Sequence, residues 1–129
     1  MCLINISPYK GKKKYGWKVV FFAKDSPHRR DLPYSVKDDD IMPEYGEMVF
    51  RLGKWHKAEE LGRFRQKLTY EPGFHVYLKK QDAMRYLDSG WKEKLMKVEF
   101  TDMIISGVTK HRNLPCVVAR KIKPIKVFK

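Results

Sequence analysis

His75 and Tyr77 are the residues of this 129-residue chain whose type and spacing most directly suggest ligand chemistry. In an extended strand, alternate side chains point to opposite faces, so Phe74, Val76 and Leu78 would share an apolar face and His75 and Tyr77 the other. A ring nitrogen and a phenol on one face could form hydrogen bonds from the floor of a pocket. A structural, half-buried polar pair is the alternative interpretation of a lone histidine on a strand.

Lysine and arginine are the largest departure from average composition. There are 28 of them against 15 Asp and Glu, a formal net charge of +13. A field of this sign attracts phosphates and accelerates association with anionic ligands. A solvated basic surface without a specific partner is the alternative. Three clusters of basic residues stand out, which are Lys10 with Lys12 to Lys14, His28 to Arg30, and Arg120 to Lys129.

Aromatic rings could supply the selectivity that phosphate contacts lack. Bases stack on aromatic side chains, and Trp17, Trp55 and Trp91 are candidates beside the His75 and Tyr77 pair, although tryptophan more often packs in a core. The sequence therefore predicts a site in which lysine and arginine meet phosphates while rings meet a base or sugar. Its predicted ligand-binding residues are His75, Tyr77, Arg120, Lys123, Arg29, Arg30 and Trp17.

Metal binding and nucleophilic catalysis are not predicted. The histidines are scattered, and no His or Cys pair has the spacing of zinc ligands. Cys2 and Cys116 form no CxxC motif, so we expect two free thiols. Cys116 precedes the apolar residues 117–119, so we expect its thiol to be buried in a strand. The sequence accordingly predicts no metal, no cofactor and no catalytic residue.

Length and composition predict one domain spanning residues 1–129. A chain of this length can bury a sufficient core without disulfides. It contains no apolar run near the roughly 20 residues of a membrane span, and its mildly apolar start precedes the first basic cluster, the reverse of a secretory signal. We therefore expect a cytoplasmic protein with no membrane partner.

Hydrophobic patterning predicts an α+β fold. The predicted architecture is a mixed or antiparallel five- to six-stranded sheet packed by one or two short helices, with a long polar loop at 24–43 wrapping part of one face. In the clearest predicted helix, 79–90, Ala83, Tyr86 and Leu87 share the face that would meet the sheet. A shorter, interrupted helix is predicted within 55–67. Strands are predicted at 15–23, 47–52, 74–78, 94–100, 103–108 and 115–128.

Short motifs throughout the chain resemble a loose group of small uncharacterised phage and bacterial proteins. That group has an N-terminal MCL, an early YK or WK strand, a GFH strand leading into a short helix, and a late VVA-K/R-x-I strand. The group also has a V-x-V strand followed by a turn of small residues. Phe100 departs from this pattern, since the group has a valine at the corresponding position. The matching segments are Met1-Cys2-Leu3, Trp17-Lys18, Gly73-Phe74-His75, Ala83 with Tyr86, Lys97 to Phe100, Ser106-Gly107 and Val117 to Ile122.

A weaker resemblance is to ADP-ribosyltransferase-like folds, whose cores contain a strand-helix unit similar to Gly73 to Tyr86. The resemblance implies an enzyme that uses NAD and a late catalytic glutamate. Glu99 is the one late candidate on a predicted strand, and the chain has no E-x-E motif. A fold analogy without its site does not establish an activity.

Together these observations predict a non-enzymatic, phage-type binding protein for a phosphate-bearing ligand, either a nucleotide signal or a nucleic acid. The resemblance adds a counter-defence role in the host cytoplasm. Two alternatives remain open from the sequence. They are an ADP-ribosyltransferase-like enzyme that uses NAD, and a basic adaptor that binds an acidic host protein, which the charge permits equally well.

Overall fold

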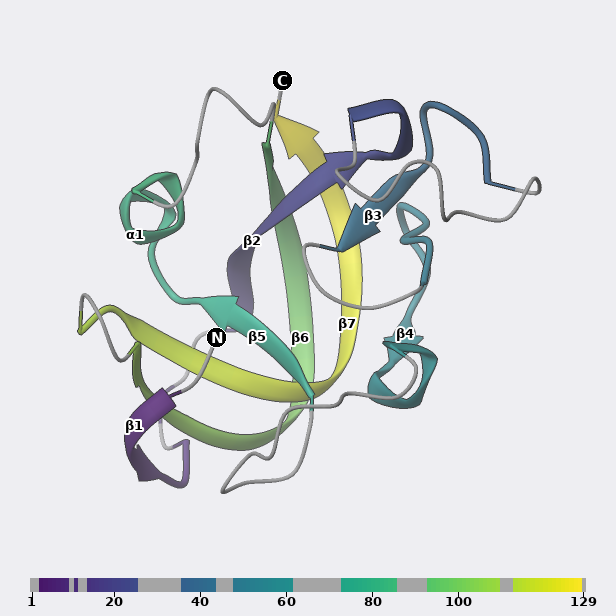
Figure 1. The fold of residues 1–129 in the computed structure, drawn as a ribbon. Helices are drawn as coiled ribbons and strands as arrows, with labels where there is room; N and C mark the ends of the chain where they lie inside the picture. Colours follow the sequence, from purple (N-terminus) through teal and green to yellow (C-terminus); the bar gives the residue numbers. More distant parts are fainter. Residues whose placement is uncertain are drawn as a thin grey trace.

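β-branched and aromatic residues dominate Tyr15–Phe22, and this segment forms a strand, β2, at the centre of the fold. The computed structural model describes residues 3–9, 11, 14–25, 36–43, 48–61, 73–85, 93–109 and 113–128. Within these ranges, seven strands pair antiparallel in one sheet (Figure 1). The strands are β1 (Leu3–Ser7), β2, β3 (Ile41–Pro43), β4 (His56–Lys57), β5 (Phe74–Tyr77), β6 (Lys94–Thr109) and β7 (Pro115–Phe128). Helical structure in the described residues comprises α1 (Lys80–Met84) and the 3-10 turns Ala23–Asp25 and Ala58–Leu61.

Four of the strands close into a ring. β6 pairs with both β2 and β7, and β5 pairs with the other edges of β2 and β7. The three remaining strands extend the ring, with β1 on β6, β3 on β2 and β4 on β7. Figure 1 shows β6 and β7 as two long, curved strands that lie side by side. A closed sheet buries its own inner face, so the core forms inside the ring.

β6 is one bent strand where the sequence predicts two. Asp102 adopts a positive φ of 55° within it, and the register with β7 shifts between Met103 and Ile105. A β-bulge of this kind bends a strand and increases its twist without ending its pairing. The predicted break at Thr101 and Asp102 is therefore a bend, and it lets the β6–β7 pair curve around the core.

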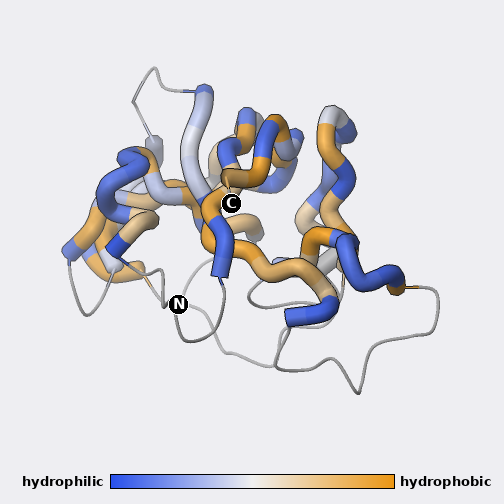
Figure 2. Tube along the Cα trace, turned by 90° about the horizontal axis from the view of Figure 1, so that it is seen from above, coloured by the Kyte–Doolittle hydropathy of each residue, from blue (hydrophilic) through white to orange (hydrophobic). Residues whose placement is uncertain are grey.

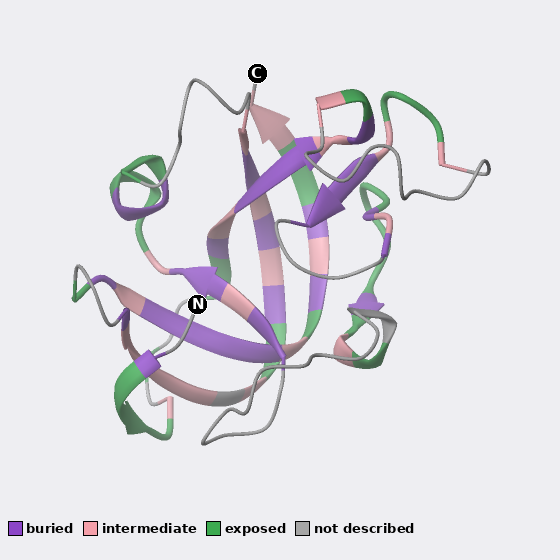
Figure 3. Ribbon diagram, viewed as in Figure 1, coloured by how far each residue is buried: buried purple, intermediate pink, exposed green. Residues whose placement is uncertain are grey.

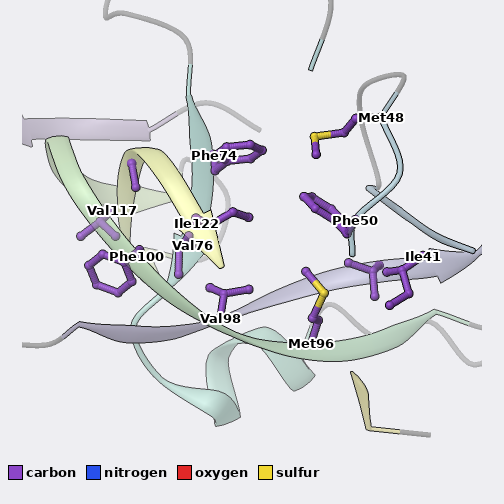
Figure 4. Close-up of a cluster of buried hydrophobic side chains, with 12 residues drawn as sticks. Ile41, Met48, Phe50, Phe74, Val76, Met96, Val98, Phe100, Val117 and Ile122 are labelled. Atoms are coloured by element: carbon purple, nitrogen blue, oxygen red, sulfur yellow. The ribbon is translucent and has the colours of Figure 1, made fainter. Parts of the chain in front are cut away.

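The core has two parts. The larger cluster fills the ring and contains Phe50, Phe74, Met96, Phe100 and Ile122, whose side chains converge in Figure 4. The smaller cluster, which we call the outer cluster, includes Ala83 of α1 and is made of Leu3, Tyr77, Ala83, Leu95, Leu114, Cys116 and Val118. In Figure 3, β5 is buried except at the partly buried His75, and β7 is buried without interruption over residues 116–119. Hydrophobic and hydrophilic residues alternate over short distances in Figure 2.

Gly16 allows the ring to close. It is buried in β2, and a Cβ at this position would run into Val76 Cγ1 and lie 2.7 Å from the Tyr77 carbonyl oxygen of β5. Next to it, Trp17 lies opposite Tyr77, the one pair in the β2–β5 register. The Lys18 ammonium donates a hydrogen bond to the His75 carbonyl at 2.7 Å, which adds a side-chain link across the same seam.

The α+β prediction is wrong. The described residues contain one α-helix of five residues, and the sheet has seven strands that need no helical layer because the ring covers its own inner face. Ala83 is buried against the sheet as predicted, while Tyr86 and Leu87 lie outside the described residues.

Several local predictions also change. The predicted loop at 24–43 ends in a strand, β3, and the predicted helix within 55–67 begins as β4 followed by a 3-10 turn. In the predicted strand at 47–52, Phe50 makes a single bridge to Ile41, and a turn follows it. The predicted strands at 15–23, 74–78 and 115–128 are confirmed to within one residue.

Gly16→Ala should lower the free energy of unfolding by about 1–3 kcal/mol, because the methyl group would overpack the β2–β5 contact. At a strand position with space, the same change would stabilise by roughly 0.4–1 kcal/mol through the unfolded chain. Urea unfolding followed by circular dichroism measures the difference. Gly53→Asn is the control, since Gly53 has open space around it and a φ of 77° that asparagine tolerates. An unchanged or raised stability in Gly16→Ala would contradict closure through this contact.

Candidate functional site

Aromatic and lysine side chains gather on the outer side of β2, β6 and β7. Trp17 lies opposite Lys97 in the β2–β6 register, and Lys97 lies opposite Lys126 in the β6–β7 register. Tyr15 lies two residues before Trp17 and Phe128 two residues after Lys126, so strand alternation places them on the same side. We call these five residues, together with Lys80 of α1, the aromatic–lysine face.

The rings of this face are anchored on one side and exposed on the other. Trp17 and Phe128 contact each other with centroids 5.6 Å apart and planes tilted by 51°. Both are partly buried and pack against the outer cluster. Tyr15 is 50% exposed. Rings held in this way keep part of their surface exposed, and a planar group can stack there once flexible side chains move aside.

Three lysine ammonium groups lie over these rings. Lys80 Nζ is 5.4 Å from the Trp17 centroid and 4.8 Å from that of Phe128. Lys97 Nζ is 5.3 Å from Tyr15 and 5.8 Å from Trp17, and Lys126 Nζ is 5.1 Å from Phe128. These are cation–π distances, which at exposed sites contribute about 0.5–1 kcal/mol.

The described residues provide no carboxylate that neutralises the charge of the face. Among the residues that the structure describes, no Asp or Glu forms an ion pair with Lys80, Lys97 or Lys126. Lys97 and Lys126 lie directly opposite each other on neighbouring strands, where like charges are unfavourable. An anion placed between them would remove this repulsion.

Of the residues predicted from sequence, Trp17 belongs to the face and Lys123 adjoins it. Lys123 forms an ion pair with Glu99 at 3.3 Å, and its Nζ lies 5.3 Å from the Trp55 ring centroid. Glu99, the late glutamate that an ADP-ribosyltransferase-like site would use, is therefore engaged by a lysine. Arg120 pairs instead with Asp102 at 3.1 Å, at the bend of β6. Arg29 and Arg30 lie outside the described residues.

His75 and Tyr77 do share the side of β5 opposite Phe74 and Val76, but that side belongs to the outer cluster. Tyr77 is only 2% exposed and packs in this cluster, so it presents almost no surface to a ligand. His75 is partly buried, and burial together with the nearby Lys18 ammonium lowers its pKa from 6.5 to about 3. The imidazole is therefore neutral at physiological pH.

Cys116 is buried and unbridged, as the sequence predicts. Burial raises its pKa to about 12, so the thiolate that nucleophilic chemistry needs is not formed near neutral pH. Cys2 lies outside the described residues. In the described part of the chain, no three His, Cys, Asp or Glu side chains come together as a metal site.

An open groove of about 500 Å³ lies between β1 and the start of β7. Its walls include Asn5, Ser7, Tyr9, Ser106 and Cys116, and none of its described lining residues is charged. Because phosphate recognition requires positive charge or converging N–H donors, the groove is less suited to a phosphate-bearing ligand than the aromatic–lysine face.

Five residues of the face are not among those predicted from sequence. The sequence contained one signal for them. Aromatic residues stand at 15 and 17, and a lysine and an aromatic residue at 126 and 128, and this spacing of two places each pair on one face of a strand. The strand register, which the sequence does not reveal, decides that these pairs and Lys97 become neighbours. The missed residues are Tyr15, Lys80, Lys97, Lys126 and Phe128.

No family model matches this chain, and no curated protein or solved structure matches it either. Among the described residues, no helix is both long enough and apolar enough to cross a membrane. The geometry of the face is therefore the main basis for assigning a function.

The buried, neutral His75 should make stability depend on pH. Its pKa in the folded protein lies below the ordinary value of 6.5, so between about pH 6.5 and pH 3 the unfolded chain binds a proton that the folded chain does not. Acidification through this window therefore favours unfolding. From pH 7 to pH 5 this one group should remove up to about 2 kcal/mol of unfolding free energy.

Urea unfolding of the parent and of His75→Gln at both pH values separates this contribution from that of the carboxylates. The stability difference between parent and variant should shrink or change sign towards pH 5. A difference that stays constant with pH would show that His75 titrates normally in the folded protein.

Proposed function

We propose that this protein binds, without transforming it, a ligand that carries both phosphates and aromatic bases, that is, a nucleotide or a nucleic acid. The observation that carries this proposal is the aromatic–lysine face, where three partly or half-exposed rings are interleaved with three lysines that no described carboxylate neutralises. Rings provide stacking surfaces for bases, and lysines provide contacts for phosphates.

Ligand binding on this face would exchange one set of contacts for another. A base that stacks on Trp17 or Phe128 takes the place of the Lys80 ammonium now above these rings. Lysine has a flexible stem of four carbons, so the displaced ammonium can turn to a phosphate of the same ligand. The cation–π contacts in the free protein thus keep the lysines near the positions where phosphates would lie.

The whole-molecule charge supports the same proposal. The net charge of +13 attracts anions over a range that salt screens, and each phosphate that a lysine contacts releases condensed counterions. A phosphate near Lys97 and Lys126 would also relieve the repulsion between these facing residues. Binding would therefore be strongest at low ionic strength.

The two other functional classes give different results in simple assays. An ADP-ribosyltransferase-like enzyme would consume NAD, whereas the proposed binder returns its ligand unchanged. A basic adaptor would bind an acidic protein without a preference for bases over other polyanions. A phage origin and a counter-defence role rest on the sequence resemblance, and the binding proposal does not depend on them.

Removing an aromatic side chain from the face should weaken ligand binding without changing the salt dependence of that binding. Trp17→Ala should weaken binding of a fluorescently labelled twelve-nucleotide oligothymidylate by about 1–3 kcal/mol, the contribution of one stacked base. Fluorescence anisotropy at several salt concentrations measures both quantities. Because Trp17 also packs against the core, Tyr15→Ala provides a second, half-exposed ring, and Ile6→Ala on β1 is the control. Equal affinity in the parent and both ring variants would contradict the proposal.

Removing lysines should instead reduce the salt dependence. For single strands, each phosphate bound by a lysine adds about 0.7 to the steepness of log K against log salt. The double variant Lys97→Gln and Lys126→Gln should therefore flatten the slope by about 1.4 if each lysine binds one phosphate. Lys37→Gln, in the exposed turn before β3, is the matched control. If the control flattens the slope as much per lysine as the double variant does, the phosphates do not bind at this face.

A further inference from the structure

We infer that the ligand is a single-stranded nucleic acid of several nucleotides, and that Trp55 extends the aromatic–lysine face beyond β7 by providing a further ring on which a base stacks. This inference rests on the proposed function and specifies its substrate class. Lys123 connects the Tyr15 and Trp55 rings. Glu99 lies opposite Tyr15 on one neighbouring strand and opposite Lys123 on the other, and the Lys123 ammonium reaches towards the Trp55 ring.

Trp55 is held in place by the turn that precedes it. The Gly53 N–H donates to the Pro124 carbonyl of β7 at 2.7 Å, and the Lys54 N–H donates to the Arg51 carbonyl at 3.2 Å. The Arg51 N–H donates to Nε2 of the buried His56 at 2.9 Å. The turn is therefore fixed against β7, while the Trp55 side chain remains 40% exposed.

The spacing of the rings requires more than one base. Tyr15 and Trp17 are two residues apart on one strand, so their Cα atoms are separated by about 7 Å, roughly twice the distance between stacked rings. Trp17 and Phe128 contact each other and form one platform. Trp17 and Lys123 lie two strands apart, about 10 Å across the sheet. Tyr15, the Trp17–Phe128 pair and Trp55 are thus three separate platforms, each suited to its own base.

The same geometry favours a single strand over a duplex. In a duplex each base face is covered by the neighbouring pair, so flat rings find only base edges in the grooves. Single strands can splay their bases onto aromatic side chains. Among the described residues, the α-helix that could enter a major groove is α1, which is five residues long and packed on the sheet.

The test is a length series of oligothymidylates of one, three, six and twelve nucleotides, with a twelve-base-pair duplex as competitor. In the parent, affinity should rise about five-fold or more for each base stacked, up to at least three nucleotides. The hexamer should bind more tightly than the duplex at equal salt. Trp55→Ala should weaken the hexamer by about five-fold or more and the mononucleotide by less, because a single base can still stack on either of the other two platforms.

Two controls keep the comparison specific. Leu52→Ala removes another exposed apolar side chain from the same turn and should bind every length as the parent does. Trp55→Phe keeps a ring and should retain most of the hexamer affinity. Thermal unfolding confirms that all variants are folded before titration.

The outcomes separate the two proposals. A mononucleotide that binds as tightly as the dodecamer overturns the inference and leaves the proposed function standing. A duplex that binds as tightly as the hexamer, or a Trp55→Ala variant that binds the hexamer normally, also overturns the inference. If no member of the series binds at low salt, the proposed function fails as well.

Discussion

The close approach of β2 to β5 at Gly16 is the constraint on which the rest of the structure depends. β6 and β7 pair along most of their length, but β2 and β5 meet at one register pair, Trp17 with Tyr77. Closure of the ring is therefore concentrated in a few contacts. Gly16 provides the space for them, and the Lys18 ammonium ties the His75 carbonyl across the same seam.

Closure also decides which residues are available for binding. The inner side of the ring is filled with apolar side chains such as Phe74, Phe100 and Ile122, so a polar ligand has no room there. Because strand side chains alternate, the residue next to the inward-facing Gly16 must point outward. That residue is Trp17. The β2–β5 contact that closes the sheet thus turns the indole at the centre of the aromatic–lysine face towards solvent.

The face combines features that cost stability with features that suit an anionic ligand. Lys97 and Lys126 repel each other across neighbouring strands, and Tyr15 leaves half of its surface in water. Cation–π contacts offset part of this cost in the free protein. The nearby Lys123 behaves differently, since Glu99 neutralises it. Partly exposed rings beside lysines that no described carboxylate neutralises are consistent with a surface that meets a partner carrying negative charge and flat rings.

The sequence by itself determined the local and global quantities that follow from residue type. It predicted the alternation at Phe74–Tyr77, the strand-forming segments of β2 and β7, the buried thiol of Cys116 and the excess positive charge. Only the tertiary structure decided that the sheet closes, that Asp102 bends β6 instead of ending it, and that Tyr77 lies in the core. Those outcomes depend on register and on contacts between residues far apart in the chain, which local patterns do not encode. Trp17, Lys97, Lys126 and Phe128 became one face for the same reason.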